Sequence, residues 1–401
     1  MNYSIKKLFI VPFLLFLSTC INTKDEQIFL SKLHPAWYPK QNNKLQELLK
    51  EKNQIAKDRF GFMTDKNQVR ALIMPHAGIT CSGHVAAAAT KILENSDIKK
   101  VVVLGGLHRP YNSKTPFVLL PPEFTKYSMP QGNIEVASQV SADICQNYAH
   151  LFSYNLQAFE NEHSLEIELP FLQKYLSSFE LIPILVGQPN DNQIKQMAQI
   201  LTPFIDDHTL VVASSDFTHY GPNYGYTPFA QNQQKKIKKI DSMAIEHIQN
   251  LDLNAFDQFL KQTHASICGS MPIKLLMALA NNNAFGKLYS NLVAYDTSAE
   301  KIESNQTNSV SYVGLVFSND NPKNKPLKDQ FSQYEKEDLL KMSRNVLENI
   351  YAEQKLNPAL LEPTKTTSQK QPMGTFVTLR KGASKRLRGC IGRIISPYPL
   401  Y

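Results

Sequence analysis

Histidine and acidic side chains follow three short apolar runs that lie far apart in the sequence. His76 comes shortly after ALIM, and His108 shortly after VVVLGG. The run LVVAS leads to Ser215 and Asp216, with His219 three residues further on. Because ligands bind outside the carboxyl ends of strands in open α/β sheets, these side chains are predicted to meet in one crevice. There His76 and His108 would offer two imidazole ligands, and Asp216 or His219 could complete or orient a metal shell.

A thiol and a further imidazole are predicted near the same crevice. Cys268, in THASICGSMPIKLL, stands before a helix-like stretch, where the pKa of a thiol is lowered toward thiolate. His163 lies in a loop before a helix that Ser164 opens and that Pro170 is predicted to kink. Two imidazoles with one soft or carboxylate ligand suit iron, zinc or copper rather than magnesium.

Each of these residues also has a plainer interpretation. A lone histidine after a strand is more often a hydrogen-bonded core or rim residue than a ligand. Asp216 is at least as often a cap or turn former, and Cys268 taken alone is most often a small buried hydrophobe. Trp37, the single tryptophan, is by default a core anchor and otherwise a cleft wall. His84 is interpreted as a surface or packing residue.

Alternating strand-like and helix-like segments are predicted to position these residues between residues 25 and 318. Strands are predicted at VRALIMP, KKVVVLGG, FELIPILVG, HTLVVASSD, LYSNLVAYDTS and SVSYVGLVFS. Helices are predicted at HVAAAATKILEN and NQIKQMAQILTPFI, twice within 228–262, and at 271–282. This alternation predicts an α/β fold, a layered sheet flanked by helices.

The net charge of +8 is concentrated near the C-terminus. Residues 319–401 carry fifteen Lys and Arg against eight Asp and Glu, whereas the first 318 residues carry 28 against 27. The nearly neutral main domain has no basic face, so no nucleic-acid partner is predicted for it. The five cysteines are widely spaced and include no CxxC, which argues against a disulfide framework.

Residues 1–20 have the pattern of an export signal peptide. Two lysines precede an apolar run, Leu8–Leu17, which is about half as long as a membrane-spanning helix requires. LSTC resembles the lipobox of bacterial lipoproteins, with Cys20 as the acylated residue, although Thr19 departs from the usual small residues. We therefore predict an exported protein anchored to a membrane surface by a lipidated Cys20. Plain secretion, into the periplasm or outside the cell, and an uncleaved anchor are the alternatives.

A second module is predicted after a linker. Residues 319–330 are polar and contain prolines, as linkers do. Residues 331–401 are predicted to contain an amphipathic helix in QYEKEDLLKMSRNVLENIYAEQ, then two strands around a basic turn in GTFVTLRKGASKRLRGCIGRI. Residues 331–401 contain too few apolar side chains for a core of their own. We therefore expect this module to be incomplete or to pack against another part of the protein or a partner.

Residues 34 to 317 resemble the Memo family, protein B of the AmmeMemoRadiSam system. The matching stretches are HPAWYP, PHAGITCSG, VVVLGGLH, ENEHSLEIELPF, LIPILVGQ, VVASSDFTHYG and HASICGSMPI. The resemblance implies the fold of LigB-type class III extradiol dioxygenases, which use non-haem iron. It also implies a set of site residues: His76, His108 and Cys268 as metal ligands, with His219, Asp216 and His163 as catalytic residues of the same cleft.

The sequence departs from the dioxygenase pattern in two places. Cys268 stands where those enzymes have a carboxylate ligand, and Arg109 stands where a second consecutive histidine is expected. The resemblance implies a protein that binds iron or copper, with zinc as a third option. One hypothesis is a dioxygenase-like oxidoreductase with His219 as its acid–base partner. The other is a non-catalytic scaffold that binds metal and holds a peptide against Trp37.

The C-terminal module resembles the beginning of the AMMECR1 family, protein A of the same system. The resemblance rests on GTFVTLRKGASKRLRGCIGRI, with LRGCIG at residues 387–392. The fusion implies that the two modules act together, with a radical SAM protein as partner and a peptide or small molecule as substrate. A third hypothesis follows, in which a macromolecule is modified and the basic C-terminal module contacts it.

Overall fold

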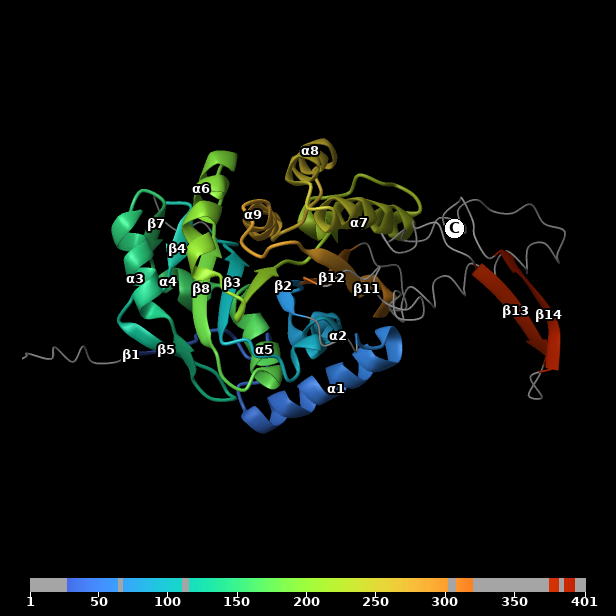
Figure 1. Cartoon of the computed structure of the whole chain (residues 1–401), viewed down its shortest axis with the longest axis horizontal. Helices are drawn as coiled ribbons and strands as arrows, with labels where there is room; N and C mark the ends of the chain where they lie inside the picture. Colours follow the sequence, from blue (N-terminus) through green and yellow to red (C-terminus); the bar gives the residue numbers. More distant parts are fainter. Residues whose placement is uncertain are drawn as a thin grey trace, which may run out of the picture.

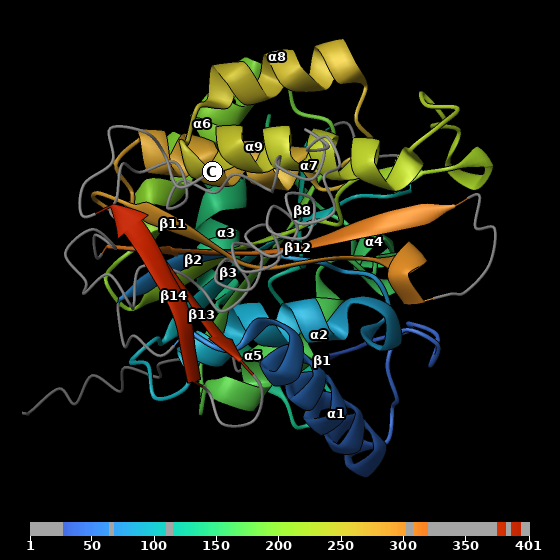
Figure 2. The ribbon, with the colours of Figure 1, turned by 90° about the vertical axis from the view of Figure 1, so that its right-hand side faces the viewer.

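The computed structural model describes residues 27–63, 68–109, 115–301 and 308–319, together with the backbone of 375–381 and 386–393. The long described segments form a large mixed sheet with helices on both faces, as Figure 1 and Figure 2 show. The predicted layered α/β architecture is therefore confirmed. None of the helices described is long and apolar enough to cross a membrane. The predicted signal peptide, the linker from residue 320 onward and the C-terminal amphipathic helix lie outside the described residues.

The large sheet has twelve strands, most of them short. They are β1 (Gln27–Leu30), β2 (Val69–Met74), β3 (Lys100–Gly106), β4 (Phe117–Leu119), β5 (Phe124–Ser128), β6 (Ile134–Val136), β7 (Phe152–Tyr154), β8 (Glu180–Val186), β9 (Thr209–Ser214), β10 (His219–Tyr220), β11 (Tyr289–Thr297) and β12 (Ser309–Ser318). Their order is β1-β5-β6-β8-β3-β9-β2-β12-β10, with β11 beside β12, and β4 linking β7 to β8.

The centre of the sheet is parallel. Strand β3 pairs in parallel with β8 and β9, and β9 pairs in parallel with β2. The carboxyl ends of β3, β9 and β2 are therefore neighbours at one edge of the sheet. Strands β2 and β9 are buried along their whole length, and their runs of valine, leucine and isoleucine are typical of parallel strands covered on both faces.

Nine α-helices and five short 3-10 helices lie among the described residues. The α-helices are α1 (Asn42–Phe60), α2 (Ile79–Thr90), α3 (Ser138–Asn147), α4 (Leu156–Asn161), α5 (Leu169–Tyr175), α6 (Asp191–Leu201), α7 (Gln233–Gln249), α8 (Leu253–Thr263) and α9 (Ser270–Asn281). The 3-10 helices are η1 (Lys91–Leu93), η2 (Glu166–Glu168), η3 (Thr202–Phe204), η4 (Pro222–Tyr224) and η5 (Ser298–Lys301). In Figure 2, α1, α2 and α5 cover one face of the sheet, and α6 to α9 cover the other.

Two apolar cores result, one on each face of the sheet. Along β2, Leu72 and Met74 belong to the core beneath α1, α2 and α5, whereas Ala71 and Ile73 belong to the core beneath α6 to α9. This alternation follows from the two-residue period of a strand. Because both faces are packed, the strand ends that carry the polar residues are held rigidly.

The structure corrects two local predictions. Ser164 does not open a helix that Pro170 kinks: η2 comes first, and α5 begins at Leu169, so Pro170 lies in its first turn. There its missing N–H breaks no intrahelical hydrogen bond. Of the two interpretations of His84, packing is confirmed and surface is wrong, because its side chain is fully buried, stacks on Phe60 and pairs through Nε2 with the carboxylate of Asp296.

The two strands predicted in the C-terminal module are confirmed. Strand β13 (Thr375–Lys381) pairs antiparallel with β14 (Arg386–Arg393). Cys390, in LRGCIG, lies opposite Thr378 in this register.

Candidate metal centre

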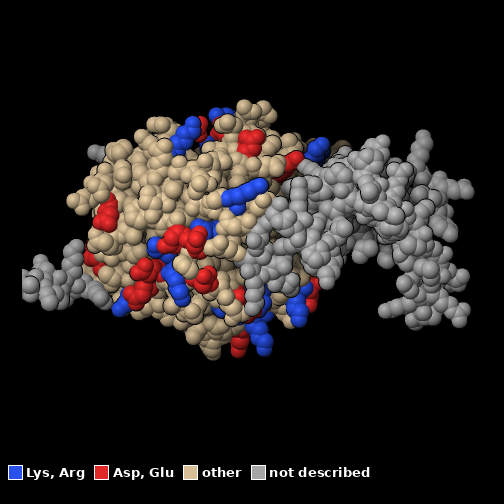
Figure 3. Space-filling model, in the orientation of Figure 1, with Lys and Arg blue, Asp and Glu red and all other residues tan. Residues whose placement is uncertain are grey.

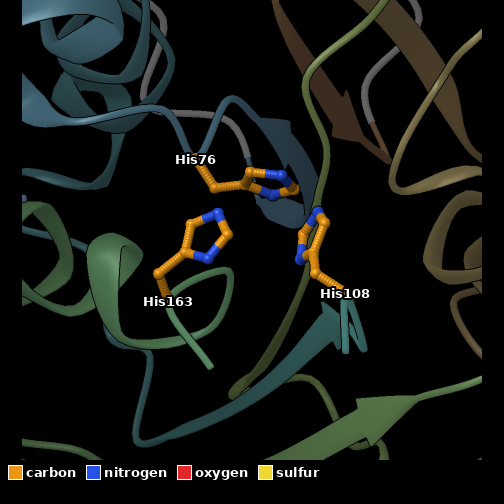
Figure 4. Close-up of side chains that lie close together, drawn as sticks. All are labelled: His76, His108 and His163. Carbon is orange, nitrogen blue, oxygen red and sulfur yellow. The ribbon is translucent and has the colours of Figure 1, made fainter. Parts of the chain in front are cut away.

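Three histidines from separate segments converge at the edge of the sheet. His76 follows β2, His108 follows β3, and His163 precedes η2. One ring nitrogen from each lies within 4.8 Å of those of the other two. The ring centroid of His76 is 5.0 Å from that of His108 and 5.3 Å from that of His163. Figure 4 shows the three rings gathered around a common centre.

Ser214, the last residue of β9, fixes the ring of His76 from behind. Nδ1 of His76 lies 2.8 Å from Oγ of Ser214, and this hydroxyl donates its proton to the carbonyl oxygen of Ser164. Ser214 therefore accepts from His76, which places the imidazole proton on Nδ1 and leaves Nε2 free as a ligand. Burial, reinforced by the neighbouring imidazoles, lowers the pKa of His76 well below its usual value. The ring is neutral, as metal ligation requires.

Glu162 orients the other two imidazoles. Its Oε1 lies 3.0 Å from Nδ1 of His108 and 3.2 Å from Nδ1 of His163. The backbone N–H of His108 donates to Oε2, and those of His163 and Ser164 donate to Oε1. Although burial opposes the charge, the hydrogen bond from His108 and the nearby imidazoles of His108 and His163 lower the pKa of Glu162 to about 2. A carboxylate on Nδ1 leaves Nε2 of each ring available to a ligand.

The two imidazoles on Glu162 differ in basicity. Burial lowers the pKa of His108, but its hydrogen bond to Glu162 and the charges of Glu162 and Asp216 outweigh burial and raise it. For His163, burial dominates over the charge of Glu162, and with His108 and Arg109 it lowers the pKa to about 4. His163 is therefore a neutral donor over a wider pH range than His108.

Cys268 lies against the same cluster. Its Sγ is 3.0 Å from Nε2 of His76 and 3.5 Å from the backbone oxygen of Asp216. The next residue, Gly269, allows this approach, since a Cβ there would collide with the backbone of Ser214 and the side chain of Ser215. The predicted lowering of the thiol pKa is wrong: burial, followed by the charge of Asp216, raises it well above its usual value. Backbone groups next to Cys268, including that of Gly269 just before α9 begins at Ser270, lower the pKa, but burial outweighs them.

Asp216 and His219 follow β9 and lie next to the histidine cluster. Oδ1 of Asp216 accepts the backbone N–H of His76 at 2.9 Å, so the carboxylate caps the loop that carries this histidine. Burial raises the pKa of Asp216 to about 6, although His219 and the backbone donors act against it. Nδ1 of His219 faces the carbonyl oxygens of Phe217 and Ser266, at 2.9 and 3.1 Å. These acceptors place its proton on Nδ1.

Trp37 stacks on the imidazole of His163. The ring centroids are 3.9 Å apart and the planes are inclined by 20°. The backbone oxygen of Trp37 accepts the N–H of Ile79, which begins α2. The neighbouring Tyr38 donates its hydroxyl to the buried Glu166. Trp37 therefore packs on the core at one edge and forms a wall of the histidine cluster at the other.

Comparison with known proteins places this site in a family. A family model described as Memo-like protein matches residues 33–316. The chain belongs to the Memo-like protein family. A second family model, AMMECR1, matches residues 340–401.

The similar curated proteins come from animals. Protein memo-1 homolog of Caenorhabditis elegans is 28% identical over 258 residues, 62% of this chain and 72% of that protein. Protein MEMO1 of Xenopus tropicalis is 31% identical over 54% of this chain and 74% of that protein, and Protein MEMO1 of Homo sapiens is 30% identical over 56% and 75%. The crystal structure of an uncharacterized protein from Escherichia coli K12 aligns with 62% of this chain and 99% of that one, at a TM-score of 0.39 and 11% identity.

The side chains of this Memo family member fit a metal ion. The three imidazoles converge, and Glu162 stands behind two of them as an outer-shell carboxylate. Imidazole nitrogen suits zinc, copper, iron and nickel, and an adjacent sulfur favours the softer of these. The His and Glu cluster could therefore bind a metal, and its donors do not distinguish between these ions.

The structure brings together most of the residues singled out in the sequence. His76, His108, His163 and Cys268 are neighbours, and Asp216 and His219 lie beside them. Sequence reasoning gave no role to Glu162 or to Ser214. Glu162 directly precedes His163, and Ser214 ends a strand beside Asp216, so both carried a positional signal. Their partners, His108 and His76, are 54 and 138 positions away, which only the fold reveals.

Proposed function

We propose that this Memo family member holds one transition-metal ion between His76, His108, His163 and Cys268. The observation that supports this most directly is the convergence of three imidazoles whose ligand nitrogens lie within 4.8 Å of one another. In each ring Nδ1 faces an oxygen of Ser214 or Glu162, so the free Nε2 atoms are the donors. The proposal keeps the ligands predicted from the resemblance and adds His163.

Iron or copper is the ion we propose, with zinc as the alternative. Imidazole and thiolate donors bind all three ions. When bound, iron or copper would supply the one-electron redox chemistry that the side chains lack. Because burial raises the pKa of Cys268, its thiol would lose a proton as the cation enters. Glu162 and Ser214 would hold the rings of His108 and His76 in place.

Elemental analysis of protein purified without oxygen and under reducing conditions tests this assignment. We expect about one iron or copper ion per chain, held by ligands of this number and type. His76→Ala should lose the ion, whereas His208→Ala should retain it, because His208 is mostly exposed and pairs with Asp97. A wild-type chain that stays metal-free after incubation with iron, copper and zinc would contradict the proposal.

We further propose a redox enzyme with His219 and Asp216 as its proton-handling residues. Asp216, whose pKa burial raises to about 6, is buried beside the cluster, and the neighbouring imidazole of His219 acts against this rise. The pair could store a proton at Asp216 and exchange one at Nε2 of His219. The test compares oxygen consumption by the metal-loaded protein and by His219→Gln. Equal rates would exclude His219 as the acid–base group.

The second candidate function is a non-catalytic scaffold that binds metal and a peptide. The AMMECR1 match at residues 340–401 supports it, because it joins a second module, which could hold a partner, to the metal-binding domain. We propose a radical SAM protein as the partner of this scaffold and a membrane anchor at Cys20.

Each of these two proposals has its own test. Removal of residues 319–401 should abolish capture of the radical SAM partner, and Cys20→Ala should release the protein from membranes. Unchanged capture and unchanged membrane association would contradict these two proposals respectively.

A further inference from the structure

Glu168 is a buried carboxyl group that the proposed metal centre does not use. It ends the 3-10 helix η2, and its side chain is fully buried. Neither of its carboxyl oxygens has a hydrogen-bond partner among the described residues. An isolated carboxylate without partners is among the most costly groups to bury, and such a group keeps its proton instead.

Glu168 lies four residues after Ser164, whose carbonyl oxygen accepts the hydroxyl of Ser214 at the strand end behind His76. Burial is the main cause of a pKa of Glu168 well above its usual value; the hydroxyl of Ser214 acts against this, and the charge of Asp216 adds to it. The two carboxyl groups differ in their surroundings. Asp216 accepts backbone N–H groups and lies near His219, whereas no backbone N–H among the described residues donates to Glu168. These surroundings favour the negative charge on Asp216 and the proton on Glu168.

The hydroxyl oxygen of Ser214 can accept one further hydrogen bond. It donates its proton to the carbonyl oxygen of Ser164 and accepts from Nδ1 of His76. A hydroxyl oxygen has two lone pairs, so one is left. A carboxylate at Glu168 would compete with Ser164 for the Ser214 proton, whereas a protonated carboxyl would donate to the remaining lone pair.

We propose that Glu168 is kept as a neutral carboxylic acid whose O–H donates to Oγ of Ser214, and that it thereby holds Ser214 and His76 in the arrangement that leaves Nε2 of His76 free. Glu168 is then a positioning residue that acts on the cluster through Ser214. With this bond, every donor and acceptor of Ser214 is used, and a fully satisfied network specifies a single arrangement. The consequence for metal affinity rests on the proposed function, whereas the neutral acid and the imidazole tautomer do not.

Infrared spectroscopy tests the neutral acid directly. The metal-free wild type at neutral pH should show the carbonyl band of a protonated carboxyl group, and Glu168→Gln should lose it. Glu166→Gln is the matched control and should keep the band, because Glu166 pairs with Lys40 and accepts from Tyr127. Wild-type protein labelled with carbon-13 at the glutamate carboxyls gives the same readout without a variant. Absence of a label-sensitive band would overturn the proposal.

Nitrogen-15 spectra of labelled histidine test the positioning role. Glu168→Gln retains an N–H donor and should keep the His76 proton on Nδ1, whereas Glu168→Met has no donor and should lose this single tautomer. Metal affinity should stay within about threefold in Glu168→Gln and fall by about tenfold or more in Glu168→Met. Wild-type tautomer and affinity in the folded Met variant would overturn the positioning role. A wild type that shows the band and the tautomer but binds no metal would contradict the proposed function alone.

Discussion

The Sγ atom of Cys268 lies 3.0 Å from Nε2 of His76, although the two residues are 192 positions apart in the chain. His76 lies two residues after the end of β2, and Cys268 lies two residues before the start of α9. Nε2 is the nitrogen that the hydrogen bond to Ser214 leaves free. A sulfur and an imidazole nitrogen at this separation can share one cation, since metal–sulfur and metal–nitrogen bonds are about 2.0 to 2.3 Å long.

Replacing the thiol should weaken metal binding without unfolding the chain. We expect Cys268→Ala to lower affinity for copper or iron by about tenfold or more, because the soft donor is lost. The loss should be smaller for zinc, which imidazole nitrogens alone also bind well. Competition against a chromophoric chelator measures the affinity of each variant for copper or iron and for zinc. Cys145→Ala is the control, since Cys145 lies near Phe152 and outside the cluster. Equal losses in both variants would argue against Cys268 as a ligand.

Neutralising Glu162 should disturb two ligands at once. Glu162→Gln keeps the size of the side chain but removes the charge that faces Nδ1 of His108 and Nδ1 of His163. Loss of an outer-shell carboxylate typically costs about 10- to 100-fold in metal affinity. Isothermal titration would show this fall, whereas Glu160→Gln, which removes a surface ion pair with Lys32, should bind as the wild type does. Wild-type affinity in Glu162→Gln would show that the carboxylate does not support the ligands.

Metal affinity should decrease as pH is lowered, and the pKa of His108 should set the pH at which this decrease begins. A protonated imidazole cannot bind a cation, so affinity is lost as pH falls through the pKa of each ligand. The pKa of His108 is raised, whereas that of His163 is about 4 and that of His76 is well below its usual value. As pH falls through the raised pKa of His108, about one additional proton should be released per ion bound. Titrations in buffers of different ionisation enthalpy count these protons. Release of two or more additional protons above pH of about 5 would contradict this order of pKa values.

The buried ion pair around Asp296 should make stability depend on acid. Asp296 accepts two hydrogen bonds from Arg59 and pairs with His84, which joins α1 and α2 to β11. Burial opposes its charge, but His84 and Arg59 together lower the pKa of Asp296 from 3.8 to about 2. Because the folded value is below the unfolded one, this stabilisation is complete above about pH 5 and is lost as pH falls toward 2.

Asp296→Asn should therefore lower the free energy of unfolding at neutral pH by about 3 kcal/mol, since it removes the buried carboxylate with which Arg59 and the buried His84 pair. The part of the acid dependence due to Asp296 should disappear in the same variant. Urea titrations at several pH values measure both effects. Glu94→Gln, in an exposed pair with Lys91, should change stability by less than about 1 kcal/mol. Equal losses of unfolding free energy in the two variants would show that the buried pair stabilises the fold no more than an exposed pair does.

Much of the fold could be predicted from local patterns. The apolar runs that became β2, β3, β8 and β9 are buried over nearly their whole length, so Val, Leu, Ile and Ala make up most of their sequences. Pro170 was misplaced because helical spacing does not show where a 3-10 turn gives way to an α-helix. The sequence left His84 between a surface and a packing role because its partner, Asp296, is 212 positions away. A buried charge becomes plausible only when the opposing charge is known.

The sequence by itself determined which strands end in chemically active residues. His76, His108 and Asp216 each follow an apolar run, and parallel strands bring such ends to one edge of a sheet. The tertiary structure decided which donors meet and in what state. It joined His163 to the cluster through Glu162, raised rather than lowered the pKa of Cys268, and buried the carboxyl group of Glu168 without a hydrogen-bond partner among the residues described. Desolvation and long-range hydrogen bonds set these properties, and both depend on neighbours that sequence spacing does not contain.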